Sequence, residues 1–223
     1  MNWIEFWNKQ QSQANPYKQV GRVLNGQAIS PEIMAKIAAR IAQQLQLKPH
    51  ETLLDVCCGN GVLDTLLLPK VATIHGIDLS DALIAEAKQL NLSNLTFSSA
   101  NAVSFGLNQT FDKSLLYFSF QYIETLADAQ KVIENLLKHT HNDALILIGD
   151  IPNQLEFFTY YNTPSKWWQW IKQELKGANE MGRFWHPKEL LRICENLGVK
   201  AEIQTQEPWQ PYAHYRFDLL IYS

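Results

Sequence analysis

Two hydrophobic patterns alternate along most of this chain. Short, nearly continuous apolar runs predict strands at residues 52–56, 73–78, 95–99, 111–118 and 144–149. Apolar positions at helical spacing predict helices between them, at 61–68, 81–90 and 126–138. Strands that are apolar on both faces and alternate with amphipathic helices indicate a parallel sheet, covered by helices on both sides and joined by right-handed crossovers.

The chain ends in two further predicted strands. Residues 199–205 and 215–222 follow a strand pattern, and the loop at 208–211 leaves room for antiparallel pairing at the sheet edge. The expected fold class is therefore α/β: a doubly wound, mostly parallel seven-stranded sheet with an antiparallel last strand and helices on both faces. A length of 223 residues with 46% hydrophobic residues suits a single domain over 1–223.

Residues 1–47 precede this alternation as N-terminal helices and a lid segment. Residues 2–13 predict an aromatic-rich amphipathic helix that would cap the core. Residues 15–26 are rich in turn formers and too polar for a buried strand, which makes them a candidate lid. Ser30 followed by Pro31 is an N-cap with a first-turn proline, so a second helix begins there and ends near Leu47.

A second departure from the alternation is the aromatic-rich stretch at 154–185, after a break at 150–153. We interpret this stretch as an insertion that covers the substrate. Trp167, Trp168 and Trp170 cannot all lie on one helical face, so at least one faces a pocket or a partner.

Composition narrows the classes of function. The net charge is −3 and the lysines are dispersed, which argues against nucleic acid as a partner. The N-terminus lacks a basic start with an apolar run, and the apolar stretches are strand-sized, so we expect a cytoplasmic protein without a membrane span. Three cysteines without metal-ligand spacing predict reduced thiols and no structural zinc.

The candidate chemistry lies where the first two predicted sheet strands end. The strand with Asp55 runs into a turn with Gly59 and Gly61 and then a helix, which exposes backbone N–H groups at the carboxyl edge of the sheet. Asp78 ends the next strand, at a distance suited to ribose hydroxyls, and the N-cap Ser80 leaves it free for a ligand. The missing third glycine argues against a nicotinamide dehydrogenase.

These motifs resemble the class I S-adenosylmethionine-dependent methyltransferases, which have a Rossmann-like fold. The resemblance covers the chain from about Thr52 onward and implies that Gly59 and Gly61 line the methionine part of the cofactor. It also implies that Asp55 organises the loop or binds the amino group and that Asp78 holds the ribose. The chain departs from the family at Cys57, where glycine is usual.

Further cofactor residues follow from the resemblance and from the candidate lid. Asn101 and Ala102 stand where the family commonly has an acid near the adenine amino group, and Tyr117 and Phe118 would face the reactive methyl region. Gln19 and Arg22 of the lid are hypothesised to close over the cofactor carboxylate. The expected cofactor-binding set is Gln19, Arg22, Asp55, Cys57, Gly59, Gly61, Asp78, Leu79, Asn101, Ala102, Tyr117 and Phe118.

Loops beyond the fourth and fifth strands supply the candidates for catalysis and substrate binding. The candidate catalytic residues are His186, His214 and Tyr122, and the candidate substrate-binding residues are Tyr160, Tyr161, Trp168 and Tyr215. His186 has an alternative as the cap of the helix that follows it, and His214 as a structural hydrogen-bond partner. Asp150, Asn153 and Glu124 offer oxygen atoms, but their spacing is not distinctive and no metal is predicted.

The expected function is methyl transfer from S-adenosylmethionine to a small molecule, at a hydroxyl of a sugar-like or aromatic acceptor. Residues 149–153 and 214–218 resemble bacterial methyltransferases of surface-glycan pathways. Two alternatives stay open: a catalytically silent cofactor-binding or scaffolding subunit whose insertion is an oligomer interface, and a nicotinamide-dependent dehydrogenase. The sequence leaves the oligomeric state open as well.

Overall fold

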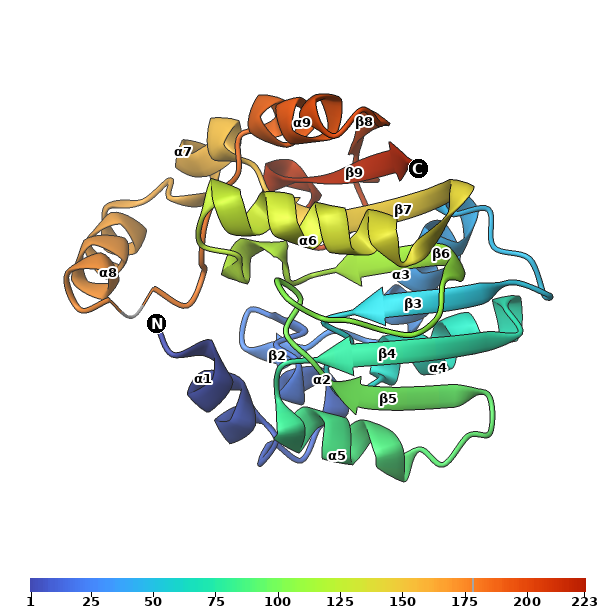
Figure 1. Cartoon of the computed structure of the whole chain (residues 1–223). Coiled ribbons are helices and arrows are strands. Elements are labelled where there is room, and N and C mark those ends of the chain that lie inside the picture. The colour runs from blue at the N-terminus through green and yellow to red at the C-terminus, as the bar shows by residue number, and fades with distance from the viewer. Residues whose placement is uncertain (178) are drawn as a thin grey trace.

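A seven-stranded sheet in the order β5-β4-β3-β6-β7-β9-β8 forms the centre of the molecule in the computed structural model, which describes residues 1–177 and 179–223 (Figure 1). Its strands are β3 (Thr52–Val56), β4 (Thr73–Asp78), β5 (Leu95–Ser99), β6 (Phe111–Tyr117), β7 (Thr140–Pro152), β8 (Lys200–Thr205) and β9 (Arg216–Tyr222). All neighbours pair in parallel except β9, which is antiparallel to both β7 and β8. The predicted fold class is confirmed, with β8 rather than β9 at the edge.

Helices cover both faces of this sheet, as the apolar strands require. The helices α3 (Pro31–Gln44), α4 (Val62–Leu67) and α5 (Asp81–Gln89) bury their apolar sides against one face, and α6 (Leu126–Lys138) and α9 (Pro187–Asn196) against the other. Figure 1 shows α6 and α9 in front of the sheet and α3 behind it. The predicted caps are confirmed: the hydroxyl of Ser30 accepts from the N–H of Ile33, and that of Ser80 from the N–H of Leu83.

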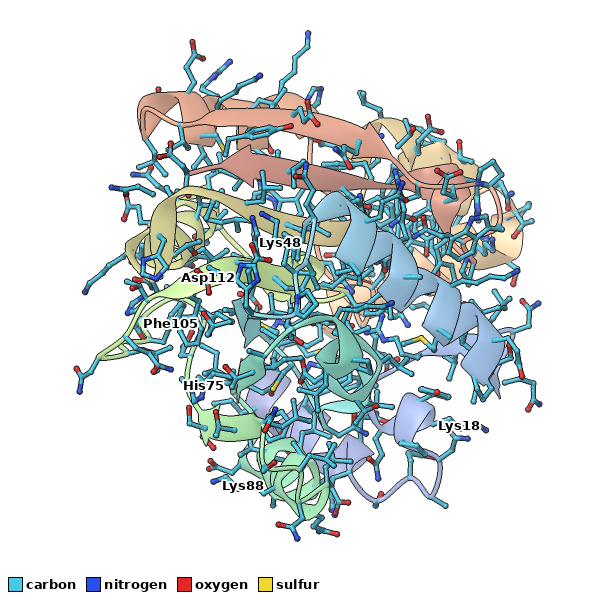
Figure 2. All side chains as sticks on the ribbon, turned by 90° about the vertical axis from the view of Figure 1, so that its right-hand side faces the viewer. Lys18, Lys48, His75, Lys88, Phe105 and Asp112 are labelled. Atoms are coloured by element: carbon cyan, nitrogen blue, oxygen red, sulfur yellow. The ribbon has the colours of Figure 1, made fainter. Side chains whose placement is uncertain are left out.

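The two ends of the parallel strands differ in what they carry. At the amino-terminal end, which faces the viewer in Figure 2, the Asp112 carboxylate accepts from the backbone N–H and the hydroxyl of Thr52, at 2.8 and 2.9 Å. At the carboxyl end lie α1 (Trp3–Gln10), α2 (Pro16–Gln19) and the hairpin of β1 (Val23–Leu24) and β2 (Gln27–Ala28) (Figure 1). Ligands of open α/β sheets bind at this carboxyl end.

The first helix does not cap the core, contrary to the sequence expectation. No residue of α1 is buried, and Trp3 and Trp7 line a cavity at the carboxyl end of the strands. None of its residues belongs to either apolar cluster of the sheet. Its aromatic side therefore covers a site rather than a core.

The segment after β6 contains the largest corrections to the predicted elements. The strand predicted at 144–149 runs from Thr140 to Pro152 and contains a bulge, with a register shift between Ile148 and Ile151. Asp150 takes a positive φ of 60° there, which allows the strand to resume pairing with β9. The bulge thus brings the Asp150 side chain under the carboxyl end of the sheet.

The predicted insertion at 154–185 consists of short helices: a 3-10 turn at Gln154–Glu156, α7 (Phe157–Tyr160) and α8 (Pro164–Leu175). Residue 178, inside this range, lies outside the described residues. Further 3-10 turns are at Leu68–Lys70, Phe120–Tyr122 and Ala213–Tyr215. Within the described ranges, the structure has no helix long and apolar enough to cross a membrane.

Candidate active site

The loop after β3 has a backbone that favours glycine at three positions. Cys57, Gly59 and Gly61 all have positive φ, of 63°, 60° and 73°. A Cβ atom at Gly59 would lie 2.6 Å from Cγ1 of Val20, and one at Gly61 would lie 2.7 Å from the ring of Phe97. The left-handed φ at Cys57 explains why glycine is usual there, since a side chain costs free energy in that conformation.

Asp78 connects this loop to the end of β4. One carboxylate oxygen accepts from the N–H of Gly59 at 2.9 Å, and the other accepts from the N–H of Ser80 at 2.8 Å. The capping role of Ser80 suggested that Asp78 would be free for a ligand. Asp78 is not entirely free, because it also holds the loop in place. A carboxylate has about four acceptor sites, so two remain for the hydroxyls of a ribose.

Burial raises the pKa of the Asp78 carboxyl, while its hydrogen bonds to the N–H groups of Ser80 and Gly59 act in the opposite direction.

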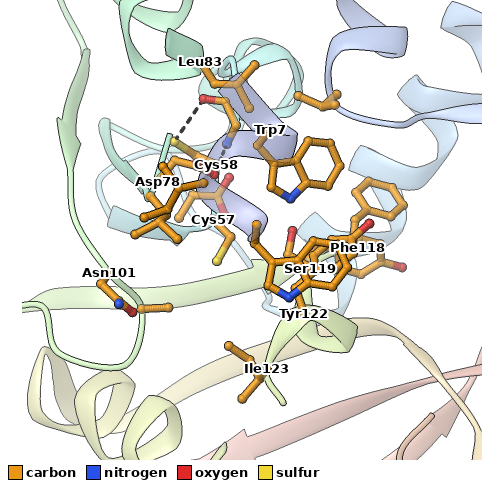
Figure 3. Close-up of a pocket in the computed structure, with 18 of the residues that line it drawn as sticks. Trp7, Cys57, Cys58, Asp78, Leu83, Asn101, Phe118, Ser119, Tyr122 and Ile123 are labelled. Atoms are coloured by element: carbon orange, nitrogen blue, oxygen red, sulfur yellow. Dashed lines mark hydrogen bonds between the residues drawn. The ribbon is translucent and has the colours of Figure 1, made fainter. Parts of the chain in front are cut away.

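A cavity of about 390 Å³ opens above the loop (Figure 3), and we call it the cofactor cavity. Its volume is in the range of small-ligand sites. Ten of the twelve expected cofactor residues line it, namely Arg22, Asp55, Cys57, Gly59, Asp78, Leu79, Asn101, Ala102, Tyr117 and Phe118. In Figure 3, Asp78 and Asn101 lie on one side of the cavity and Tyr122 on the other. Polar groups suited to a nucleoside thus share a cavity with apolar surface.

The two remaining members of the expected set, Gln19 and Gly61, lie outside the lining. The amide of Gln19 donates to the carbonyl oxygens of Gln11 and Gln13, and its oxygen accepts from Asn60 at 2.7 Å. Gln19 therefore joins the predicted lid to the glycine loop instead of reaching into the cavity. Gly61 serves as the N-cap position of α4.

Asn101 is placed where the resemblance implied, but its carbonyl oxygen is already used. It accepts from the N–H of Val103 at 2.9 Å in a local turn, which leaves the Asn101 amide N–H groups for a ligand.

The aromatic side of α1 forms the cover of the cofactor cavity. The indole ring of Trp3 packs on Tyr122 at 4.5 Å between centroids, and its Nε1–H donates to Glu124 at 3.0 Å. Trp7 contacts the same tyrosine ring at 5.3 Å. Because the hydroxyl of Ser80 donates to Asn8 at 2.6 Å, the helix is also tied to the end of β4. The sequence showed these aromatics on one side of a helix but not what that side would meet.

A second cavity, of about 590 Å³, adjoins the first, and we call it the acceptor cavity. The two share Trp7, Arg22 and Tyr122. Tyr160, Tyr161 and Tyr215, which the sequence proposed for substrate binding, all line the acceptor cavity. Tyr160 packs on Tyr215 at 4.7 Å, so these rings form one continuous wall.

The structure places three other candidates away from both cavities. His186 is the N-cap of α9, where its Nδ1 accepts from the N–H of Lys188 at 3.1 Å. The ring of His214 packs on Tyr215 at 4.9 Å and lines neither cavity. Trp168 is 64% exposed. Its neighbours Trp167 and Trp170 pack instead on Phe157, at 6.1 and 5.4 Å.

Tyr122 is the one expected catalytic residue at the junction of the cavities. Burial raises the pKa of its hydroxyl, against the opposing charge of Arg22. The side chain therefore stays a phenol at neutral pH. It can donate a hydrogen bond or position a ligand ring, but it is not a general base there.

Two carboxyl groups lie buried behind the loop, and sequence reasoning missed the second. Asp55 is 2% exposed and Asp64, in the first turn of α4, is fully buried. Neither oxygen of Asp64 accepts from an N–H or hydroxyl of the described residues, which leaves the Asp55 carboxyl as its donor. Burial raises the pKa of Asp64 to about 7, and burial together with the charge of Asp64 raises the pKa of Asp55 further. At neutral pH the pair therefore holds a proton.

The adjacent cysteines of the loop are protonated thiols. Burial raises the pKa of both Cys57 and Cys58, and the charges of nearby aspartates, Asp78 for Cys57 and Asp64 for Cys58, raise it further. A metal ligand or nucleophile would need a thiolate. Among the described residues, no group of three or more His, Cys, Asp or Glu side chains is arranged to hold a metal ion. Asp150, considered as an oxygen ligand from the sequence, pairs with Arg216 at 2.7 Å.

The strand order of the sheet, the glycine loop after β3 and Asp78 at the end of β4 are together typical of an S-adenosylmethionine-dependent methyltransferase. Residues 47–216 match the model of the family described as "Methyltransferase domain", and the chain belongs to this family. The nicotinamide dehydrogenase alternative is thereby excluded. The enzyme transfers a methyl group from S-adenosylmethionine to a small molecule.

Relatives and solved structures agree with this assignment. The ubiquinone biosynthesis O-methyltransferase of Coxiella burnetii (strain Dugway 5J108-111) is 26% identical over 190 residues, covering 80% of this chain and 75% of the relative. The 2-phytyl-1,4-naphtoquinone methyltransferase of Nostoc sp. (strain PCC 7120) is 30% identical over 165 residues, covering 70% and 62%. The N-methyltransferase NodS of Bradyrhizobium japonicum WM9, solved with S-adenosyl-L-homocysteine, superposes with a TM-score of 0.67 at 14% identity and covers 100% of this chain and 98% of its own.

Proposed function

We propose that this enzyme methylates a hydroxyl group of an aromatic small molecule that enters the acceptor cavity. The junction of the two cavities at Trp7, Arg22 and Tyr122 carries this proposal. When bound, S-adenosylmethionine supplies a methyl group on a positively charged sulfur. A second cavity that adjoins the cofactor cavity offers the acceptor an approach to that group, and positioning supplies much of the rate of such a transfer.

Different residues around the cofactor cavity suit different parts of the cofactor. Asp78 offers its two remaining acceptor sites to ribose hydroxyls, and the apolar side chains of Leu79, Ala102 and Val103 suit an adenine ring. The buried Asp55 lines the same cavity behind the glycine loop, where the carbonyl oxygen of its carboxyl group can accept from the ammonium group of the methionine part. Arg22 lines both cavities and is open to an anionic group from either side.

Wall chemistry of the acceptor cavity favours an aromatic hydroxyl over a sugar alcohol. Burial raises the pKa of all five tyrosines of its lining, so none is a base at neutral pH; they are Tyr122, Tyr160, Tyr161, Tyr212 and Tyr215. A phenolic hydroxyl, with a pKa of about 10, needs much less help to lose its proton than an alcohol does. Aromatic walls also suit a ring acceptor. The two relatives above are named for ubiquinone biosynthesis and for a naphthoquinone, both of which concern ring compounds.

A transfer assay with S-adenosylmethionine labelled in the methyl group tests the proposal. We expect labelled product from a catechol and none from a methyl glucoside at equal concentration. Trp7→Ala, at the junction, should lower the rate with the catechol, whereas Trp168→Ala, an exposed aromatic outside both cavities, should not. Transfer to the sugar alone would contradict the aromatic acceptor.

A further inference from the structure

Two buried arginines border the acceptor cavity, and they share a single nearby carboxylate. Arg22 is 7% exposed and Arg216 is 8% exposed. Nη1 of Arg216 donates to the backbone oxygen and the side-chain Oδ2 of Asp150, at 2.6 and 2.7 Å. Arg216 thus forms an ion pair with this carboxylate.

Arg22 lacks a comparable partner. Its Nε donates to the backbone oxygen of Val20 at 2.8 Å, and its guanidinium lies 4.0 Å from the ring centre of Phe118. Its two terminal nitrogens have no hydrogen-bond or ion-pair partner among the described residues. Burying a cation without a hydrogen-bonded counter-ion costs free energy. Burial lowers the pKa of Arg22, the charges of Tyr122 and Asp150 act in the opposite direction, and the positive charge of Arg216 lowers it.

Asp218, another buried carboxylate, does not serve as the partner of Arg22. The oxygens of Asp218 accept from the backbone N–H of Asp150 and from the side-chain amides of Gln44 and Gln206, at 2.9 to 3.0 Å. Asp218 forms no ion pair with either arginine. A bound ligand can therefore supply an anion for the terminal nitrogens of Arg22.

Charges around the acceptor cavity agree with an anionic occupant. Lys18 and Lys166 line it together with the two arginines, and Glu180 is the one acidic residue of the lining. The whole chain is acidic by contrast, with 22 Asp and Glu against 19 Lys and Arg. A basic cavity in an acidic protein attracts anions and repels cations.

We propose that the methyl acceptor is an anion, and that its carboxylate or other oxyanion group lies against Arg22 in the acceptor cavity. This inference rests on the proposed function and narrows its substrate class. Arg22 also lines the cofactor cavity, but there it is the one lysine or arginine beside four acidic residues, whereas Lys18, Lys166 and Arg216 line the acceptor cavity alone. The surrounding charge thus favours an anion in the acceptor cavity over the methionine carboxylate of the cofactor.

Calorimetric titration of the protein saturated with S-adenosylhomocysteine tests this proposal with matched probes. The pairs are 3,4-dihydroxybenzoate with its amide, and phenyl phosphate with phenol. We expect the anion of at least one pair to bind about tenfold more tightly than its neutral partner, which is the size of a charge-assisted hydrogen bond. Equal affinity within both pairs, or binding of neither anion, overturns the proposal.

Substitutions test which cationic side chains cause the preference for the anion. Arg22→Gln should abolish the preference for the anion, and Lys88→Gln, which removes an exposed cation on α5 (Figure 2), should keep it. A second comparison does not depend on the fold around Arg22. Lys166→Gln on α8 should weaken the preference, and Lys172→Gln on the same helix, outside the cavity lining, should not. An unchanged preference in both Arg22→Gln and Lys166→Gln overturns the proposal.

The cofactor carboxylate is the competing source of an anion for Arg22. S-adenosylhomocysteine carries that carboxylate and 5′-methylthioadenosine lacks it. If Arg22→Gln weakens only the first of these ligands and leaves the preference for anionic probes intact, Arg22 serves the cofactor and the inference fails. Failure of the wild-type protein to bind S-adenosylhomocysteine at all would instead defeat the proposed function itself.

Discussion

The buried pair of Asp55 and Asp64 predicts that Asp64→Asn stabilises the protein, and more so at higher pH. The pKa of Asp64 is raised from 3.8 to about 7 by burial. A group whose pKa is higher in the folded state than in the unfolded state stabilises the fold while it is protonated. That contribution is complete below about pH 4 and is lost as the pH rises through 7. The wild-type protein therefore loses stability across this window.

The size of the effect follows from the shift. One pKa unit corresponds to 1.36 kcal/mol, so a rise from 3.8 to about 7 is worth at most about 4 kcal/mol above pH 7. Asparagine occupies nearly the same volume, carries no charge and can donate to Asp55. We expect the free energy of unfolding of the variant to exceed that of the wild type by about 1 kcal/mol at pH 4.5 and by about 2 to 4 kcal/mol at pH 8.5.

Urea unfolding of both proteins without cofactor, at pH 4.5, 6, 7.5 and 8.5, measures this difference. Asp81→Asn is the control, because Asp81 is an exposed carboxylate in the first turn of α5. Its difference from the wild type should be small and should change little between pH 6 and 8.5. A difference for Asp64→Asn that stays constant with pH, or a variant less stable than the wild type at pH 8.5, would refute the account of this pair.

Two further substitutions test other parts of the structure. Gly149→Ala would push a Cβ atom into the ring of Tyr117 and should lower the free energy of unfolding by about 1 to 3 kcal/mol. Gly106→Ala, where a Cβ atom would meet open space, should change the free energy of unfolding little. Equal unfolding curves for the two variants would contradict this packing. Trp3→Ala removes the ring contact with Tyr122 and should raise KM for S-adenosylmethionine about threefold to tenfold. Because α1 has no buried residue, the thermal midpoint of Trp3→Ala should barely differ from that of the wild type. An unchanged KM would show that the helix does not cover the cofactor.

Periodicity was enough to predict the central strands, because buried parallel strands are apolar on both faces. The strands β3 and β4 were predicted with the bounds observed, and so were the glycine loop and Asp78 at their ends. These features depend on residues close together in sequence. The break predicted at Asp150 was wrong because the bulge there depends on pairing with β9, almost seventy residues further on.

The remaining site residues depend on contacts between distant segments. An aspartate in the first turn of a helix is common on the surface, so nothing in the sequence marked Asp64 as buried against Asp55. Likewise, three tryptophans on one helix showed that their environments must differ, but not that Trp168 would be the exposed one. The cover by Trp3 required knowing where α1 lies relative to Tyr122.

Binding of S-adenosylhomocysteine tests the central claim most directly, and calorimetry measures it without knowledge of the acceptor. The account predicts one site per chain in the wild-type protein and, in Asp78→Ala, an affinity lower by about tenfold to a hundredfold, because the carboxylate holds the loop at Gly59 and offers sites to the ribose. A wild-type protein that gives no binding heat, or an Asp78→Ala variant that binds as tightly as the wild type, would contradict the account.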